Sequence, residues 1–242
     1  MENIPIFYLP TNILKTTNTF RYWDPSIFIF PNPYQVINEG DIIPGIKPPL
    51  PLESREFYKK IRPSGEDGVA RDIKRGIPEN VKLREFFTPF VGQIIVDIGP
   101  GDTITGYEIA LLSSANSYVG VEPYYFTECV IKFTKQNLDS LRKKSARIPH
   151  TIVEADALSF LRRLPDRSVS LFASQLEGVM KEEYRIDVEK EIQRVLHPQG
   201  AFIGYDSKLS LDRNTFQYDL FDKESSDDAG LYFQLEKYKL KT

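Results

Sequence analysis

Three short apolar segments in the middle of the chain each run directly into a carboxylate residue. The segments are 93–97, 117–122 and 150–156, and they end at Asp97, Glu122 and Asp156. Runs rich in Val and Ile, separated by helix-length segments, predict successive parallel strands of an α/β sheet. Because ligands on such sheets bind outside the carboxyl ends of the strands, we expect the three acids to line one pocket. A ligand for this acidic pocket should carry positive charge, hydroxyl groups and amino groups.

The loop after the first segment separates two classes of ligand. A dinucleotide-binding loop has the pattern Gly-x-Gly-x-x-Gly, whose third glycine permits close packing of helix on strand. Here the loop begins Gly99-Pro100-Gly101 and has Ile104 in place of the third glycine. Asp97 and Asp102 would also lie close to a pyrophosphate, where like charges are unfavourable. S-adenosylmethionine has no phosphate, and its ammonium, sulfonium, ribose diol and adenine amine are each matched by a carboxylate.

Five motifs between about Val91 and Ser207 resemble those of class I S-adenosylmethionine-dependent methyltransferases. In chain order they are VDIGPG at 96–101, VGVEP at 119–123, EADA at 154–157, SLFASQ at 170–175 and EIQRVLHPQG at 191–200. Together they extend over roughly half of the chain in a consistent order and spacing. The family often has a third glycine two residues after Gly101, where this chain has Thr103, and the next glycine is Gly106.

The resemblance implies a fold, a cofactor and a role for each motif. The fold is a doubly wound α/β domain with a mostly parallel seven-stranded sheet that ends in an antiparallel hairpin. The cofactor is S-adenosyl-L-methionine, with Asp97 on the ammonium, Glu122 on the ribose hydroxyls and Asp156 on the adenine amine. The full set of expected cofactor-binding residues is Asp97, Gly99, Pro100, Gly101, Asp102, Glu122, Pro123, Asp156, Ala157, Ser174 and Gln175. The alternative role for each acid is to cap the helix that follows it.

Two regions of different composition divide the chain. Residues 1–60 contain nine of the 17 prolines and ten aromatic residues, including Trp23. Proline at this density prevents long helices and central strands, but the apolar runs at 6–9 and 27–31 are not typical of a solvated linker. We expect an arm that packs on its own domain, covers the substrate pocket as a lid, or forms a homodimer contact. Residues 61–242 should form the cofactor-binding domain, with helices at 81–87, 103–115, 126–144, 157–164 and 180–196 and a terminal hairpin of 215–221 and 231–239.

Charge and cysteine content narrow the set of partners. The net charge of −3 and the pI of about 5.6 disfavour a nucleic-acid partner. Local basic clusters at 142–144 and 162–163 are expected on solvated helix faces. The single cysteine, Cys129, excludes an internal disulfide and is expected in the core, which suits a reducing compartment. The sequence has no signal-peptide pattern, no run of membrane-spanning length and no Cys/His metal cluster, so we expect a cytoplasmic protein without a membrane or metal partner.

The reaction implied by the resemblance is direct displacement of the methyl group from the sulfonium by a small-molecule or peptide acceptor. No general base is identified, because His150 and His197 are expected at the far end of the sheet from the pocket. Glu177, Tyr205 and Asp206 are better placed. No Asn-Pro-Pro-Tyr type motif follows the fourth strand, which disfavours methylation of base amino groups. A non-catalytic methyltransferase-like interaction domain and a methyltransferase acting on protein or RNA stay open as alternatives.

Overall fold

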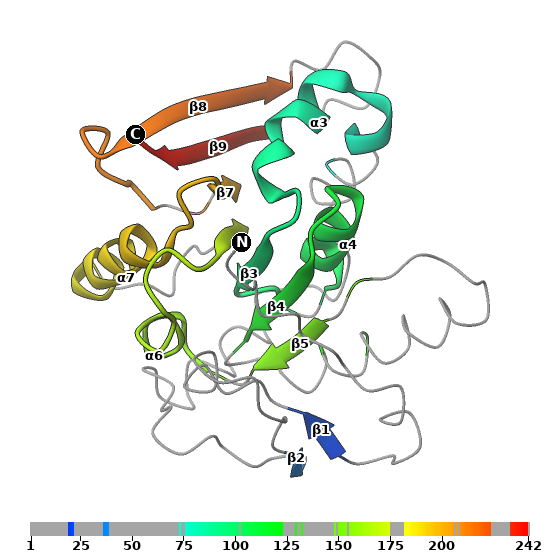
Figure 1. Cartoon of the computed structure of the whole chain (residues 1–242), viewed down its shortest axis with the longest axis vertical. Coiled ribbons are helices and arrows are strands. Elements are labelled where there is room, and N and C mark those ends of the chain that lie inside the picture. The colour runs from blue at the N-terminus through cyan, green and yellow to red at the C-terminus, as the bar shows by residue number, and fades with distance from the viewer. Residues whose placement is uncertain are drawn as a thin grey trace, which may run out of the picture.

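Five parallel strands form the centre of the protein in the computed structural model (Figure 1). They are β3 (Ile94–Ile98), β4 (Ser117–Val121), β5 (His150–Val153), β6 (Ser170–Ser174) and β7 (Phe202–Tyr205). The residues that the structure describes are 19–21, 36–38, 73, 76–101, 103–122, 129, 132, 148, 150–153, 155–174, 182–205, 207, 209–223 and 233–241.

The order of the strands places β3 at the centre of the sheet. The full order is β5-β4-β3-β6-β7-β9-β8, so the chain moves outward from β3 to one edge and then returns to continue on the other side of β3. Crossovers between parallel strands are right-handed, and helices on the two halves therefore cover opposite faces. Figure 1 shows α4 (Thr105–Leu112) on one side of the sheet, and α6 (Ala157–Leu161) and α7 (Glu182–Val195) on the other.

The register of the central strands brings the three carboxylate residues to one edge. Ile98 pairs with Val121, and Val121 pairs with Val153. The segments that follow β3, β4 and β5 therefore leave the sheet side by side. All ten residues of β3 and β4 are buried, which explains their nearly continuous apolar sequence.

An antiparallel hairpin completes the sheet. It consists of β8 (Phe216–Lys223) and β9 (Phe233–Leu240), and β9 pairs with β7. The helix α3 (Val81–Phe86), followed by the 3-10 turn η3 (Thr88–Phe90), packs beside it: the Phe86 ring lies 5.7 Å from that of Phe221, and Lys237 Nζ lies 4.2 Å from the Phe86 ring centre. The mostly parallel seven-stranded sheet with a C-terminal antiparallel hairpin confirms the predicted fold class.

Several predicted elements lie outside the described residues. The helix expected at 126–144 is described only at Cys129 and Lys132, which are both helical. In the N-terminal region, β1 (Thr19–Arg21) and β2 (Val36–Asn38) pair antiparallel. The rest of residues 1–60 lies outside the described part, so the packing, lid and dimer roles of the arm, and the boundary at residue 60, stay predictions.

None of the helices that the structure describes combines the length and the apolar composition needed to cross a bilayer.

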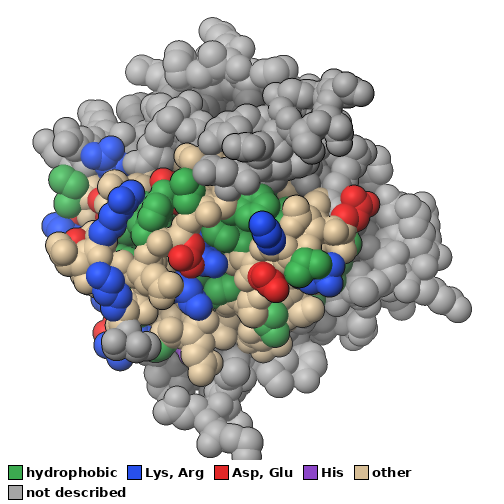
Figure 2. Space-filling model, turned by 90° about the horizontal axis from the view of Figure 1, so that it is seen from above, with side chains coloured by type: hydrophobic (Ala, Val, Ile, Leu, Met, Phe, Trp, Pro, Cys, Tyr) green, Lys and Arg blue, Asp and Glu red, His purple; other side chains and the backbone are tan. Residues whose placement is uncertain are grey.

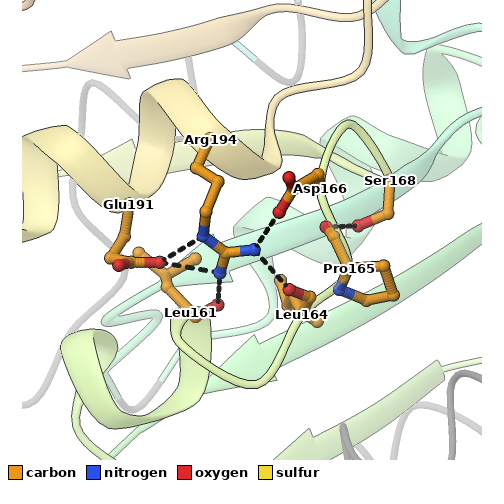
Figure 3. Close-up of polar contacts among 7 residues, drawn as sticks. All are labelled: Leu161, Leu164, Pro165, Asp166, Ser168, Glu191 and Arg194. Atoms are coloured by element: carbon orange, nitrogen blue, oxygen red, sulfur yellow. Dashed lines mark hydrogen bonds and ion pairs between the residues drawn. The ribbon is translucent and has the colours of Figure 1, made fainter.

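Hydrogen bonds of the Arg194 guanidinium link α7 to the segment between α6 and β6 (Figure 3). It donates to the carbonyl oxygens of Leu161 and Leu164, each at 2.8 Å, at the C-terminal end of α6. It also donates to the carboxylates of Asp166, at 2.6 Å, and Glu191, at 2.8 Å. One planar side chain thus supplies donors to two carbonyls at the C-terminal end of α6, of which the Leu161 carbonyl also accepts from the Leu164 amide at 3.0 Å.

We expect Arg194→Ala to lower the free energy of unfolding by about 1.5–3 kcal/mol, because it removes charge-assisted hydrogen bonds from a partly buried network. Urea unfolding would measure the loss. Arg162→Ala is a matched control, since Arg162 forms an exposed ion pair with Asp187 at 3.2 Å and such pairs contribute about 0–1 kcal/mol. Equal losses in the two variants would contradict a structural role of the Arg194 network.

Candidate active site

The loop after β3 turns sharply at two glycines. Gly99 and Gly101 have φ angles of +69° and +65°, which residues with a side chain rarely adopt. The Gly99 amide donates to the Val121 carbonyl at 2.9 Å, so the loop starts against the end of β4. The Thr103 hydroxyl then donates to the Pro100 carbonyl at 3.0 Å. The loop is thereby fixed over the carboxyl edge of the sheet, where the sequence predicts the pocket.

The Glu122 carboxylate binds the same loop from the neighbouring strand. Its Oε2 accepts a hydrogen bond from the Gly101 amide at 2.8 Å, and the side chain is 3% exposed. The Glu122 amide donates to the Val153 carbonyl at 3.0 Å, which fixes the residue between the ends of β4 and β5. Glu122 therefore lies where the sequence predicts it, with one oxygen engaged by the glycine loop.

Asp97 lies beneath the loop and is almost fully buried. Its Oδ2 accepts a hydrogen bond from the Tyr118 hydroxyl at 2.5 Å. Its Oδ1 is also buried and has no hydrogen-bond partner among the described residues. A Cβ on Gly106 in the first turn of α4 would lie only 1.9 Å from Asp97 Oδ2, so α4 can approach this carboxylate only because residue 106 has no side chain.

The electrostatics of Asp97 reflect its burial close to a second acid. Burial raises the pKa of Asp97 to about 7, the Tyr118 hydrogen bond lowers it, and the nearby Glu122 charge raises it. Burial, followed by the Asp97 charge, also raises the pKa of Tyr118 well above its usual value, so its hydroxyl is a donor at neutral pH. An ionised Asp97 at this position is favoured by any cation that enters the pocket.

Asp156 lies three residues after the end of β5 and caps the helix that follows. Its Oδ1 accepts from the Ser159 amide at 2.9 Å, at the N-terminus of α6. The side chains of Asp156 and Ala157 are both buried. The capping role that the sequence left open is therefore confirmed for one oxygen of Asp156, and a role toward adenine stays a prediction.

The remaining predicted site residues divide into two groups. Pro100 is buried within the glycine loop. Ser174 ends β6 opposite Tyr205 in β7, and only its backbone is described. The predicted site residues outside the described part of the chain are Asp102, Pro123 and Gln175, as are the two candidate bases Glu177 and Asp206.

Sequence reasoning missed two contributions to the site. Tyr118 is the hydrogen-bond partner of Asp97, and Gly106 makes room for it. The register of the two strands explains the contact: Asp97 pairs with Gly120, so Tyr118, two residues earlier on β4, projects on the same face of the sheet. Cys129 is buried as predicted, and its thiol also donates to the Gly101 carbonyl.

The two histidines lie at the end of the sheet opposite the glycine loop, as predicted. His150 pairs in register with Tyr118, and its ring centre lies 5.0 Å from that of Tyr107. His150 begins β5, at the opposite end of that strand from Asp156, and His197 follows α7 in a turn. Within the described ranges, no group of three His, Cys, Asp or Glu side chains is arranged to hold a metal ion.

Comparison with known proteins gives matches among solved structures only. No family model matches the sequence, and no curated protein matches it. An SAM-dependent O-methyltransferase from Thermotoga maritima has 12% identity, covers 80% of this chain and 72% of its own, and has a TM-score of 0.47. An rRNA methylase from Streptococcus thermophilus has 16% identity, with 65% and 93% covered and a TM-score of 0.45.

A protein from Streptococcus mutans, solved in complex with SAH, has 13% identity to this chain. The match covers 66% of this chain and 97% of that one, with a TM-score of 0.47. At such low identity we base the functional conclusion on the chain's own residues.

We expect Asp97→Asn to stabilise the protein at pH 8 by about 2–4 kcal/mol. The pKa of Asp97 is higher in the folded state, about 7, than its usual 3.8, so the native state binds this proton more tightly than the unfolded state. Its contribution therefore becomes less favourable as pH rises from about 4 to about 7. Urea unfolding at pH 4.5 and pH 8 would measure the difference. A gain of equal size at both pH values would contradict the assignment of a buried charge to Asp97.

Proposed function

We propose that this protein is an S-adenosylmethionine-dependent methyltransferase that binds its cofactor at the carboxyl ends of β3, β4 and β5. The observation that supports this most directly is the grouping of buried acids around a glycine loop. Asp97 and Glu122 are 1% and 3% exposed, and they lie close enough for the charge of one to raise the pKa of the other. Buried acids of like charge favour a cationic ligand.

The described residues match the groups of S-adenosylmethionine. The buried Asp97 Oδ1, which has no partner among the described residues, would accept from the ammonium directly or through water. Glu122 would accept from the ribose hydroxyls, a pair of charge-assisted hydrogen bonds. Asp156, with the amide of Ala157, would bind the adenine edge.

When bound, the cofactor supplies a methyl group that its sulfonium already activates. The task of the protein is then to orient the two reactants and to exclude water. The fixed glycine loop and the buried acids would hold the cofactor, and Ser174 and Gln175 at the end of β6 would line the side from which the acceptor approaches. Tyr205 on β7 pairs in register with Ser174, so it lies at the same end of the sheet as the expected acceptor side.

The acceptor that we propose is a small molecule or a peptide. The molecule carries a net charge of −3. Figure 2 shows one face on which basic, acidic and hydrophobic side chains are intermixed. A long polyanion such as RNA would be bound better by a surface of one positive sign. The net negative charge, and the mixed charges on this face, are the observations that favour a compact acceptor over a nucleic acid.

We expect Glu122→Ala to weaken the binding of S-adenosylmethionine at least tenfold, because each charge-assisted hydrogen bond contributes about 1.5–3 kcal/mol. Calorimetric titration with the cofactor and with its demethylated product would measure the affinity. Glu85→Ala, a change at an exposed acid of α3, is the control for the loss of one negative charge.

Two outcomes of this titration would count against the proposal. Unchanged affinity in Glu122→Ala would remove Glu122 from the site. Failure of the wild-type protein to bind either compound would favour the non-catalytic interaction domain instead.

We also expect neither NAD nor NADP to bind. The loop lacks the third glycine of a dinucleotide site, and the buried acids Asp97 and Glu122 would repel a pyrophosphate. Fluorescence or calorimetric titration with both dinucleotides would test this. Low-micromolar binding of either one would overturn the assignment.

A further inference from the structure

We propose that Tyr118 is a positioning residue of the cofactor site, which fixes one oxygen of Asp97 and leaves the second oxygen for the ammonium of the ligand. This inference rests on the proposed function and adds a residue outside the motifs that led to it. Its basis is the hydrogen bond from the Tyr118 hydroxyl to Asp97 Oδ2 at 2.5 Å, together with the buried Oδ1 that has no partner among the described residues.

The geometry of the sheet explains how Tyr118 reaches Asp97. The two residues lie on adjacent parallel strands, with Ile95 paired to Tyr118 and Asp97 paired to Gly120. Tyr118 and Gly120 are two residues apart on β4, so they lie on the same face of the sheet as Asp97. The Tyr118 ring extends along this face, at ordinary contact distance from the position of a Gly120 Cβ (3.4 Å), and its hydroxyl reaches the carboxylate. On its other side it contacts Tyr107 edge-on, with ring centres 5.8 Å apart.

Few groups near Asp97 can stabilise its ionised form. Among the described residues, the side chains that act on its charge are the Tyr118 hydroxyl and the Glu122 carboxylate, and of these the hydroxyl favours ionisation. On the α4 side, Gly106 contributes no side chain, and on the β6 side Asp97 pairs with the apolar Phe172. The Cys129 thiol acts on Tyr118 and not directly on the carboxylate. Tyr118 is therefore the described group that opposes the effects of burial and of Glu122.

A pH dependence of cofactor binding follows from this arrangement. Burial raises the pKa of Asp97 to about 7, and an ammonium binds the ionised carboxylate, so affinity should fall about tenfold per pH unit below pH 7. Without the Tyr118 hydroxyl the pKa of Asp97 would rise further. The pH at which affinity stops increasing would then move upward, and affinity at pH 7 would fall.

The test compares Tyr118→Phe with the wild-type protein by calorimetric titration of S-adenosylmethionine between pH 5.5 and pH 8. The substitution removes the hydroxyl but keeps the ring that packs on Tyr107. Tyr107→Phe is a matched control, because it also removes a buried tyrosine hydroxyl, which accepts from the Ile148 amide at 3.3 Å. We expect the midpoint of the pH profile to shift upward by about one unit in Tyr118→Phe and to stay unchanged in Tyr107→Phe.

The outcomes separate this inference from the proposed function. If both variants bind the cofactor with the wild-type pH midpoint, the positioning role of Tyr118 is wrong and the cofactor site stands. A uniform loss of affinity at every pH in Tyr118→Phe, with no shift of the midpoint, would show a merely structural role and would also overturn the inference. If the wild-type protein binds no cofactor at any pH, the proposed function and this inference both fail.

Discussion

The hydrogen bond from the Gly101 amide to Glu122 is the contact on which the organisation of the site depends. It joins the loop after β3 to the end of β4, so that the two segments that follow the central strands keep one relative position. The Cys129 thiol binds the carbonyl of the same glycine from the next helical segment. Three consecutive parts of the chain therefore meet at one residue whose positive φ allows both contacts. Gly101 thus links the central sheet to the two segments that carry Glu122 and Cys129.

The same arrangement places a negative charge where it does not stabilise the fold. Asp97 is the fourth residue of β3, a strand that is buried along its whole length, and lies close to a second buried acid. Removing carboxylates from water is unfavourable unless hydrogen bonds or an opposite charge compensate. The Tyr118 hydroxyl compensates in part. A strongly perturbed acid in an otherwise apolar strand is typical of a site kept for binding or catalysis and not for stability.

The sequence could predict the strands because they are buried on both faces and therefore read as unbroken apolar runs ending at the acids. It could also predict the position of Glu122, since a residue directly after a buried parallel strand lies at the carboxyl end of the sheet. The Tyr118–Asp97 contact depended on the relative register of two strands, which no local pattern encodes. The role of Gly106 depended on the distance between a helix and the sheet. For Asp156 the sequence left two roles open, and the structure shows the helix cap. Asp102, Pro123 and Gln175 stay predictions.

The absence of a side chain at Gly106 couples two positions that are nine residues apart in the chain. Any side chain at 106 would occupy the space of the Asp97 carboxylate, so neither position can vary in size independently of the other. In related chains a glycine in the first turn of this helix should accompany an acid near the end of the central strand, and a larger residue at the helix position should accompany a smaller one in the strand. The glycine in the helix, and not a third glycine in the loop, would then be the residue to follow when such sites are compared.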